Sequence, residues 1–267
     1  MNRDTIIACA EQFAQDSPGN YVSSEAALNP NCVGLKIYDA PIFGFAAPDD
    51  EIFTEYKSPG IIGEHFLSPL EFMPHAQTVI SFFLPFTKEI KSSNAMRNDW
   101  PSDEWLHGRF EGQLFVKELL LYLQELLSDA GYESLVPMHD PRFQVEESPP
   151  DRFTSNWSER HIAFACGLGT FGLSKGLITR KGVCGRFGSV LTDLDVPKDK
   201  RPYTDPYEYC TMCGSCGVNC PVDAISIEGG KKHLPCYEFL DSVLQQYKSR
   251  YGCGKCQVGV PCESGIP

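Results

Sequence analysis

A run of four closely spaced cysteines constrains this chain more than any other feature of its sequence. Cys210, Cys213, Cys216 and Cys220 have the spacing C-x2-C-x2-C-x3-C, and Pro221 follows directly. In iron–sulfur proteins this spacing lets three thiolates converge on one four-iron cluster, while the fourth cysteine turns away to bind another cluster. A zinc knuckle is the alternative, although structural zinc prefers two separated ligand pairs. The run therefore predicts 4Fe-4S clusters.

A second group of cysteines supplies the remaining ligands. If Cys220 binds a second cluster, that cluster needs three more thiolates and the first cluster needs one. The chain offers four later cysteines, which closes the count at eight. In such paired motifs the last cysteine of each run binds the cluster of the other run. We therefore predict one cluster bound by Cys210, Cys213, Cys216 and Cys262, and another bound by Cys220, Cys236, Cys253 and Cys256.

The other four of the twelve cysteines lack ligand spacing. They are Cys9, Cys32, Cys166 and Cys184. Isolated cysteines behave as small hydrophobic residues, so we expect these four to be packing residues. Cys184 lies between glycines in a predicted loop and is the one that most resembles a functional thiol.

The N-terminus and the apolar runs indicate where the protein resides. Asp4 and Glu11 interrupt what would have to be an apolar signal core, so secretion is not indicated. The longest apolar runs, such as residues 78–86, are shorter than the roughly 18 residues that a membrane span needs. We therefore expect a cytoplasmic protein without a membrane partner, whose clustered thiols are metal ligands rather than disulfides.

Charge is distributed unevenly along the 267 residues. The net charge is −12, with −14 before residue 150 and +2 after it. Binding of nucleic-acid phosphates requires clustered Lys and Arg, so the acidic first half argues against a nucleic-acid surface there. A solubilising surface is the simpler interpretation.

Periodicity and breaker residues predict a mixed α/β chain of two units. The predicted helices cover residues 4–14, residues 104–130 with a stop at Gly131, and a short stretch to residue 165 that begins at Ser155 or Ser158. Predicted strands cover residues 33–38 and 78–84, and a hairpin is expected between 176–179 and 188–191. The proline-rich stretch 196–206 predicts a connection, with a boundary near residue 200.

A glycine-rich stretch follows the short helix. Residues 167–172 match G-x-G-x-x-G, but they follow a predicted helix rather than a strand, so we do not predict a dinucleotide site. Glycines at these positions allow tight turns or close approach to a large ligand. Lys175 and Arg186 add positive charge that could hold an anionic group, and a solvated loop is the alternative.

Together these segments resemble the epoxyqueuosine reductases and the related reductive dehalogenases. Residues 74–86 resemble the early strand of that family, residues 159–178 its helix and glycine turn, and residues 185–193 the following strand. CTMCGSCGVNCPVDAI and YGCGKCQ are similar to its cluster motifs. The resemblance implies a nitroreductase-like, corrinoid-type α/β module over residues 1–200 and a ferredoxin-like domain with two 4Fe-4S clusters over residues 201–267.

The resemblance also implies a function. We expect an iron–sulfur oxidoreductase in which two clusters relay electrons to a corrinoid such as cobalamin, or to a substrate, in the N-terminal module. Asp151, His161 and Lys175 are the candidates for supplying a proton. The residues expected to hold the cofactor are Ser155, Asn156, Lys175, Arg186, Gly188 and Ser189.

Two departures from the family pattern bear on this function. Counted back from Glu159, the position of the family's proton-donating Asp falls on Phe153, and Asp151 could replace it only after a small shift. The chain stops five residues after Cys262, without the helical extension that contacts tRNA in longer members. We therefore expect a redox partner protein or a small-molecule substrate rather than tRNA. The alternative function is a non-catalytic electron carrier or activator that docks a redox partner.

Overall fold

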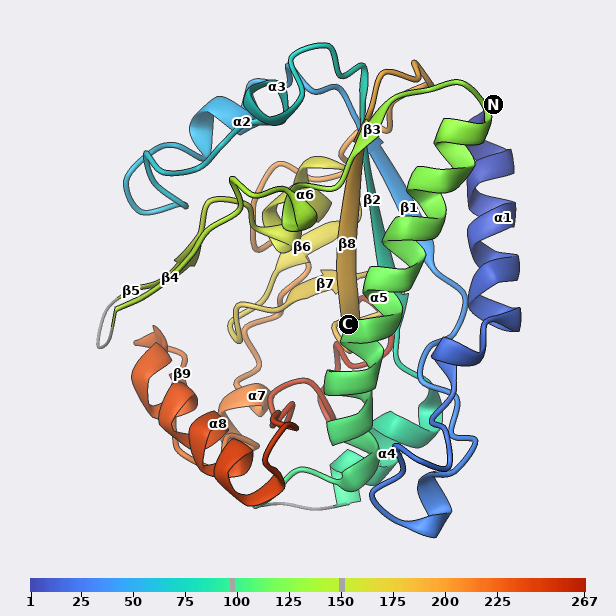
Figure 1. The fold of residues 1–267 in the computed structure, drawn as a ribbon. Helices are drawn as coiled ribbons and strands as arrows, with labels where there is room; N and C mark the ends of the chain where they lie inside the picture. The colour runs from blue at the N-terminus through green and yellow to red at the C-terminus, as the bar shows by residue number, and fades with distance from the viewer. Residues whose placement is uncertain (97–98, 149–151) are drawn as a thin grey trace.

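The centre of the molecule is a four-stranded antiparallel sheet, seen in a computed structural model that describes residues 1–96, 99–148 and 152–267 (Figure 1). Its strand order is β1-β2-β8-β3. The strands are β1 (Ile42–Ala46), β2 (Thr78–Pro85), β8 (Gly185–Thr192) and β3 (Ser134–Leu135). All residues of β2 are buried, because this strand lies inside the sheet and both faces of the sheet are covered.

Helices cover the two faces of the sheet. The long helix α5 (Asp103–Asp129) and α1 (Arg3–Asp16) lie on one side, and α6 (Glu159–Ala165) packs against β2 and β8 from the other (Figure 1). The chain leaves α5 at Gly131, whose φ of +84° is the left-handed conformation that glycine adopts readily. The predicted helices near residues 4–14 and 104–130 are thus confirmed, as is the predicted strand at 78–84.

Shorter elements surround this core. Three two-stranded sheets pair β4 (Val145–Ser148) with β5 (Arg152–Ser155), β6 (Gly169–Phe171) with β7 (Leu177–Thr179), and β9 (Ile225–Ser226) with β10 (Gly230–Lys231). The other helices are α2 (Ile52–Glu55), α3 (Pro69–Phe72), α4 (Lys88–Met96), α7 (Ser215–Val218), α8 (His233–Tyr247) and short 3-10 turns at 18–20, 30–32 and 137–139. None of the described helices combines the length and apolarity that a bilayer crossing needs.

The strand expected at residues 33–38 is not formed. Asn29 instead caps a 3-10 turn by accepting a hydrogen bond from the Asn31 backbone at 2.9 Å. Gly34 then adopts a φ of +75°, and only isolated bridges form at Lys36 and Tyr38. The local turn chemistry of the asparagine and glycine residues therefore overrides the apolar pattern.

The expected hairpin between residues 176–179 and 188–191 is also wrong. Strand β7 pairs with β6, and residues 188–191 belong to β8, which pairs with β2 and β3. Gly169 explains the first pairing, because a Cβ at this position would lie 2.0 Å from the carbonyl oxygen of Ile178. Only glycine permits β6 to approach β7 this closely.

The C-terminal segment packs onto the N-terminal half. Gly254 has a φ of +67°. Its backbone packs directly against Trp105 of α5, where a Cβ would come within 1.8 Å of the indole ring. Lys255 is only 2% exposed and donates from Nζ to the backbone oxygen of Asn94 at 2.6 Å. Contacts therefore cross the boundary expected near residue 200, and the division into two domains stays a prediction.

Two leucines on α5 test the role of this helix in the core. Leu119 is fully buried, whereas Leu121 is 44% exposed. We expect Leu119→Ala to lower the free energy of unfolding by about 2 to 5 kcal/mol, because it leaves a cavity. The matched Leu121→Ala should change it by no more than about 0.5 kcal/mol. Urea unfolding of both variants makes the comparison, and equal effects would contradict the packing described here.

Candidate metal centres and the adjoining cavity

The first predicted set of cysteines lines one small cavity, which we call the first thiol cavity. Among residues 1–96, 99–148 and 152–267, none with a charged side chain lines it. Cys213 is exposed, and Cys216 lies on α7, which begins after Gly214 in the left-handed conformation. The backbone N–H of Leu173 donates to Cys210 Sγ at 3.4 Å, so the glycine-rich region contacts this site. The four cysteines that line this cavity are Cys210, Cys213, Cys216 and Cys262.

The second predicted set lines a separate cavity, the second thiol cavity. Helix α8 supplies Cys236, and the loop that packs on Trp105 supplies two further cysteines. The backbone N–H of Ala224 donates to Cys220 Sγ at 3.3 Å. The four cysteines that line this cavity are Cys220, Cys236, Cys253 and Cys256.

The electrostatic neighbours of the thiols fall into the same two sets. Burial raises the pKa of Cys262 to about 11 and that of Cys253 to about 12. The thiols that raise the pKa of Cys262 further all belong to the first set, and those that act on Cys253 belong to the second. Cys256 also raises the pKa of Cys216, so the two cavities adjoin at these residues. Because the buried thiols are protonated, binding of iron there must release protons.

The spacing of these thiols bears on the kind of metal centre. Among the residues that the structure describes, no three His, Cys, Asp or Glu side chains come close enough to hold a single metal ion. In a four-iron cluster the thiolates are distributed over different irons, so its ligands surround a larger space.

Arg109 and Arg186 face the second thiol cavity. Their surroundings indicate whether an anionic cluster fits there. The Nε of Arg186 is buried and has no hydrogen-bond partner. Burial and the charge of Arg109 lower the pKa of Arg186 to about 9, and no carboxylate is among the groups that act on it. Buried cations require a compensating charge. A four-iron cluster with four thiolates is negatively charged, so the residues present fit this group.

A third cavity is much larger, with a volume of about 1500 Å³. It lies between α2, the β4–β5 hairpin, α6, the connection at residues 199–207 and the start of α8. Three predicted site residues line it, namely Ser155, His161 and Lys175. Its volume exceeds the roughly 300 to 1000 Å³ of most small-molecule sites, so a large cofactor or a cofactor together with a substrate is compatible with it.

The other residues predicted to hold a cofactor do not line this cavity. Asn156 is 6% exposed, and its amide hydrogen-bonds to backbone groups at residues 142 and 144. Gly188 packs against a phenylalanine ring of β2, where a Cβ would come within 2.5 Å. Ser189 accepts a hydrogen bond from the indole N–H of Trp157 at 3.0 Å. These three residues pack or hydrogen-bond within the protein interior. Arg186, the remaining predicted residue, lines the second thiol cavity.

His161 projects from α6 into aromatic surroundings. Its ring packs against Tyr56 and Phe171, and its Nδ1 lies 2.8 Å from Ser158 Oγ. Burial and the charge of Arg160 lower the pKa of His161 to about 4. At neutral pH the ring is therefore uncharged and cannot act as an imidazolium acid. Asp151, the other predicted catalytic residue, lies outside the described residues.

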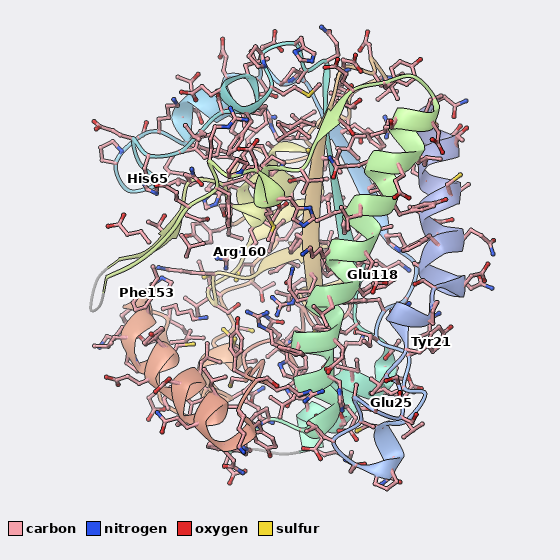
Figure 2. The ribbon with its side chains drawn as sticks, in the orientation of Figure 1. Tyr21, Glu25, His65, Glu118, Phe153 and Arg160 are labelled. Carbon is pink, nitrogen blue, oxygen red and sulfur yellow. The ribbon has the colours of Figure 1, made fainter. Side chains whose placement is uncertain are left out.

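Phe153 joins the β4–β5 hairpin to α8. Its ring stacks on His233, with centroids 5.9 Å apart, and lies 5.0 Å from the ring of Tyr237 (Figure 2). Phe153 and His233 both line the large cavity. The position that the family pattern assigns to a proton donor is therefore occupied by an apolar contact that helps to close this cavity.

Basic side chains line one part of the large cavity. Arg160, near the centre of the molecule in Figure 2, donates a hydrogen bond to the backbone oxygen of Lys175. The Nζ of Lys175 lies 3.0 Å from His233 Nε2. Burial and the surrounding positive charges lower the pKa of both groups. Burial lowers the pKa of Arg160, and the thiol of Cys256, in the second set, opposes this shift.

Sequence reasoning missed Arg160, His233 and Arg109. Arg160 is an exposed charged residue at the start of a short helix, which is the ordinary place for such a residue, so the sequence carries no signal for a cavity there. For Arg109 a signal exists, because an arginine interrupts the buried stripe of α5 between Trp105 and Phe115. A charged residue on the buried face of an otherwise apolar helix indicates a buried ion or ligand nearby.

Comparisons with known proteins agree with the cluster motif. Residues 204–226, which include the first cysteine run, match the family described as 4Fe-4S binding domain. Tetrachloroethene reductive dehalogenases of Desulfitobacterium hafniense and Dehalobacter restrictus are 39% identical to this chain over 74 residues. That match covers 27% of this chain and 13% of either relative, so the whole length of those enzymes is not represented.

Solved structures share the fold over most of the chain. An epoxyqueuosine reductase superposes with a TM-score of 0.57 at 15% identity, over 98% of this chain and 66% of that one. Another, holding an epoxyqueuosine-modified tRNA stem loop, gives 0.52 at 16% identity over 86% and 62%. A catabolic reductive dehalogenase in complex with 3-bromo-4-hydroxybenzoic acid gives 0.55 at 14% identity over 98% and 36%. The mixed α/β fold is therefore that of epoxyqueuosine reductases and reductive dehalogenases.

Iron content tests the two ligand sets. We expect about eight irons per chain after anaerobic reconstitution of the parent protein, because each set of four thiols matches one four-iron cluster. Cys213→Ser should retain about four. Cys184→Ala should retain the parent value, because its buried Sγ donates to the backbone oxygen of Gln257 at 2.8 Å and lies in neither set. Four irons or fewer in the parent, or loss of iron from the Cys184 variant, would contradict these sets.

Glu159 generates a prediction about pH. Its Oε1 accepts a hydrogen bond from the Trp157 indole at 3.2 Å, and burial raises its pKa from 4.5 to about 7. The folded state then binds more protons than the unfolded state between these values, so Glu159 makes stability fall as the pH rises through 7. We expect Glu159→Gln to be more stable than the parent at about pH 8.5 and to lose this advantage near pH 4.5. Urea midpoints measure it, and a pH-independent difference would be inconsistent with this pKa.

Proposed function

We propose that this chain is an iron–sulfur oxidoreductase that binds two 4Fe-4S clusters and uses the large cavity for a corrinoid or directly for a substrate. The observation that carries the proposal is the separation of eight cysteines into two cavities. We assign Cys210, Cys213, Cys216 and Cys262 to one cluster, and Cys220, Cys236, Cys253 and Cys256 to the other.

The order of the sites supports a path for electrons. The first set contains the exposed Cys213, which makes that site accessible to a redox partner protein. Trp105 and Arg109 of α5 line the cavity of the second set, which we propose to be the set nearer the large cavity. Four-iron clusters, when bound, accept and release single electrons. In the proposal electrons therefore enter at the exposed side and leave toward the large cavity.

The residues of the large cavity support the binding of a sizeable ligand. Ser155, His161 and Lys175 line it, together with the aromatic ring of Phe153. A corrinoid would supply the difficult chemistry, and these side chains would orient it and exclude water. Cobalamin is the corrinoid that we propose to test. A nitroreductase-like N-terminal module and cytoplasmic residence belong to the same proposal.

The substrate class follows from the relatives only in outline. One similar structure is an epoxyqueuosine reductase with a tRNA stem loop, and another is a dehalogenase with a halogenated hydroxybenzoic acid. Both a modified nucleoside in tRNA and a small aromatic acid are therefore substrates to test. We favour the small molecule, because the first half of the chain is strongly acidic and tRNA phosphates require clustered positive charge.

One observation favours a second function, that of a non-catalytic electron carrier or activator. Phe153 packs against His233 and Tyr237 where the family pattern places a proton donor. His161 is neutral at pH 7 because of its lowered pKa, so it does not replace an acid. In this alternative the two clusters pass electrons to a docked partner, and the large cavity takes no corrinoid.

Binding of cobalamin distinguishes the two functions. We expect the anaerobically reduced, cluster-loaded protein to bind base-off cobalamin, measured by the change in its visible spectrum during titration. Arg160→Glu should weaken binding at least tenfold, because it reverses a charge in the large cavity. The control Lys181→Glu changes an exposed residue that does not line this cavity and should bind as the parent does.

Two results of this titration would overturn the corrinoid assignment. The first is no binding to a parent protein that contains its full complement of iron, which favours the carrier function. The second is equal binding by the Arg160 and Lys181 variants, which places the corrinoid elsewhere.

A further inference from the structure

The two thiol cavities differ in their charge. Arg109, Arg186 and Lys231 line the second cavity, whereas none of the described residues that line the first has a charged side chain. A fourth cation, Lys255, is buried in the loop that carries two cysteines of the second set. The two candidate cluster sites each contain four cysteines, so this difference does not follow from the ligands.

Arg186 is partly exposed as a residue, but the inner part of its side chain is enclosed by the protein. It lies on β8 opposite Leu84, and its Nε is buried without a hydrogen-bond partner. The groups that act on its charge are Arg109, Arg160 and two tyrosines, and within the described part of the chain none of them is a carboxylate. A guanidinium in such surroundings is unfavourable unless an anion lies beside it.

Arg109, which lies on α5, also needs an anion nearby. Its guanidinium donates to the Tyr251 hydroxyl at 2.6 Å and stacks over the ring of that tyrosine. These neutral contacts orient the side chain but do not balance its charge. Like charges on Arg109 and Arg186 repel one another across the cavity wall, and an anion in the cavity would relieve that repulsion.

We propose that Arg186, supported by Arg109, is the counter-ion of the second 4Fe-4S cluster and selectively raises the reduction potential of that cluster. The inference rests on the proposed function, since it requires a cluster in the second thiol cavity. Reduction by one electron from an external low-potential donor adds one negative charge to the cluster. A nearby buried cation stabilises the reduced form more than the oxidised form, and solvent screens this attraction only weakly.

The proposed role offsets an effect of burial. Removal from water disfavours the more highly charged form, so burial alone would make the second cluster harder to reduce than the first, which contains the exposed Cys213. Arg186 acts in the opposite direction at the cluster that adjoins the large cavity. The electron is thereby retained beside the cavity in which it is used. Arg186 is thus a positioning residue for charge rather than a catalytic residue.

Redox titration of the reconstituted protein tests the proposal. The two midpoint potentials are measured by electron paramagnetic resonance in the parent, Arg186→Gln and Arg186→Lys, with iron content determined for each sample. In Arg186→Gln we expect one potential to become more negative and the other to stay unchanged, and Arg186→Lys should restore most of the shift. Lys117→Gln, which removes an exposed cation from the same helix as Arg109, should leave both potentials at the parent values.

The design separates the possible failures. The shift must persist in a Cys213→Ser background, in which only the second cluster remains. Unchanged potentials in a fully loaded Arg186→Gln protein, or an equal shift in the Gln and Lys variants, would overturn the role of its charge. If Arg186→Gln loses its second cluster, Arg109→Gln decides in its place, and an unchanged second potential there overturns the proposal. Four irons in the parent would instead refute the two-cluster assignment itself.

Discussion

The arrangement of this protein depends on how buried positive charge is balanced around the second thiol cavity. Arg109 and Arg186 extend from the long helix and the central sheet toward four cysteines of the C-terminal segment. Without an anion these guanidinium groups would be unpaired in a low-dielectric environment, which is costly. With a thiolate-bound cluster the same groups become part of a neutralised core. Binding of metal and packing of the C-terminal segment are therefore expected to be coupled.

Close packing positions the second set of cysteines as firmly as charge does. Gly254 lies flat against Trp105, and any side chain there would displace the loop that carries Cys253 and Cys256. Lys255 anchors the same loop to Asn94 at the end of α4. The N-terminal half thus forms one wall of a cavity whose cysteines all lie after residue 219. This dependence explains why contacts cross the boundary that the proline-rich connection predicts.

Much of this arrangement was accessible from the sequence, for physical reasons that differ between elements. The apolar period of α5 and the fixed spacing of Cys210 to Cys220 are local signals, so the helix was predicted closely and the cluster motif correctly. The grouping of Cys262 with the first run followed from the crossed ligation of such motifs, and these residues line one cavity.

Features that depend on distant contacts were not accessible in this way. The pairing of β7 with β6 depends on the close approach that Gly169 permits, and a strand pattern alone does not specify its partner. Arg186 was expected to hold a cofactor in the glycine-rich region, but it lines the second thiol cavity instead. Arg160 borders the large cavity only because α6, the β6–β7 turn and α8 converge there.

The central claim is that two iron–sulfur clusters occupy two distinct thiol cavities, the second beside the large cavity. Anomalous diffraction at the iron absorption edge from anaerobically grown crystals of the reconstituted protein measures this directly. The account predicts two separate iron peaks, one surrounded by Cys210, Cys213, Cys216 and Cys262, and the other by Cys220, Cys236, Cys253 and Cys256. A single peak, or a cluster whose ligands mix the two sets, would contradict it.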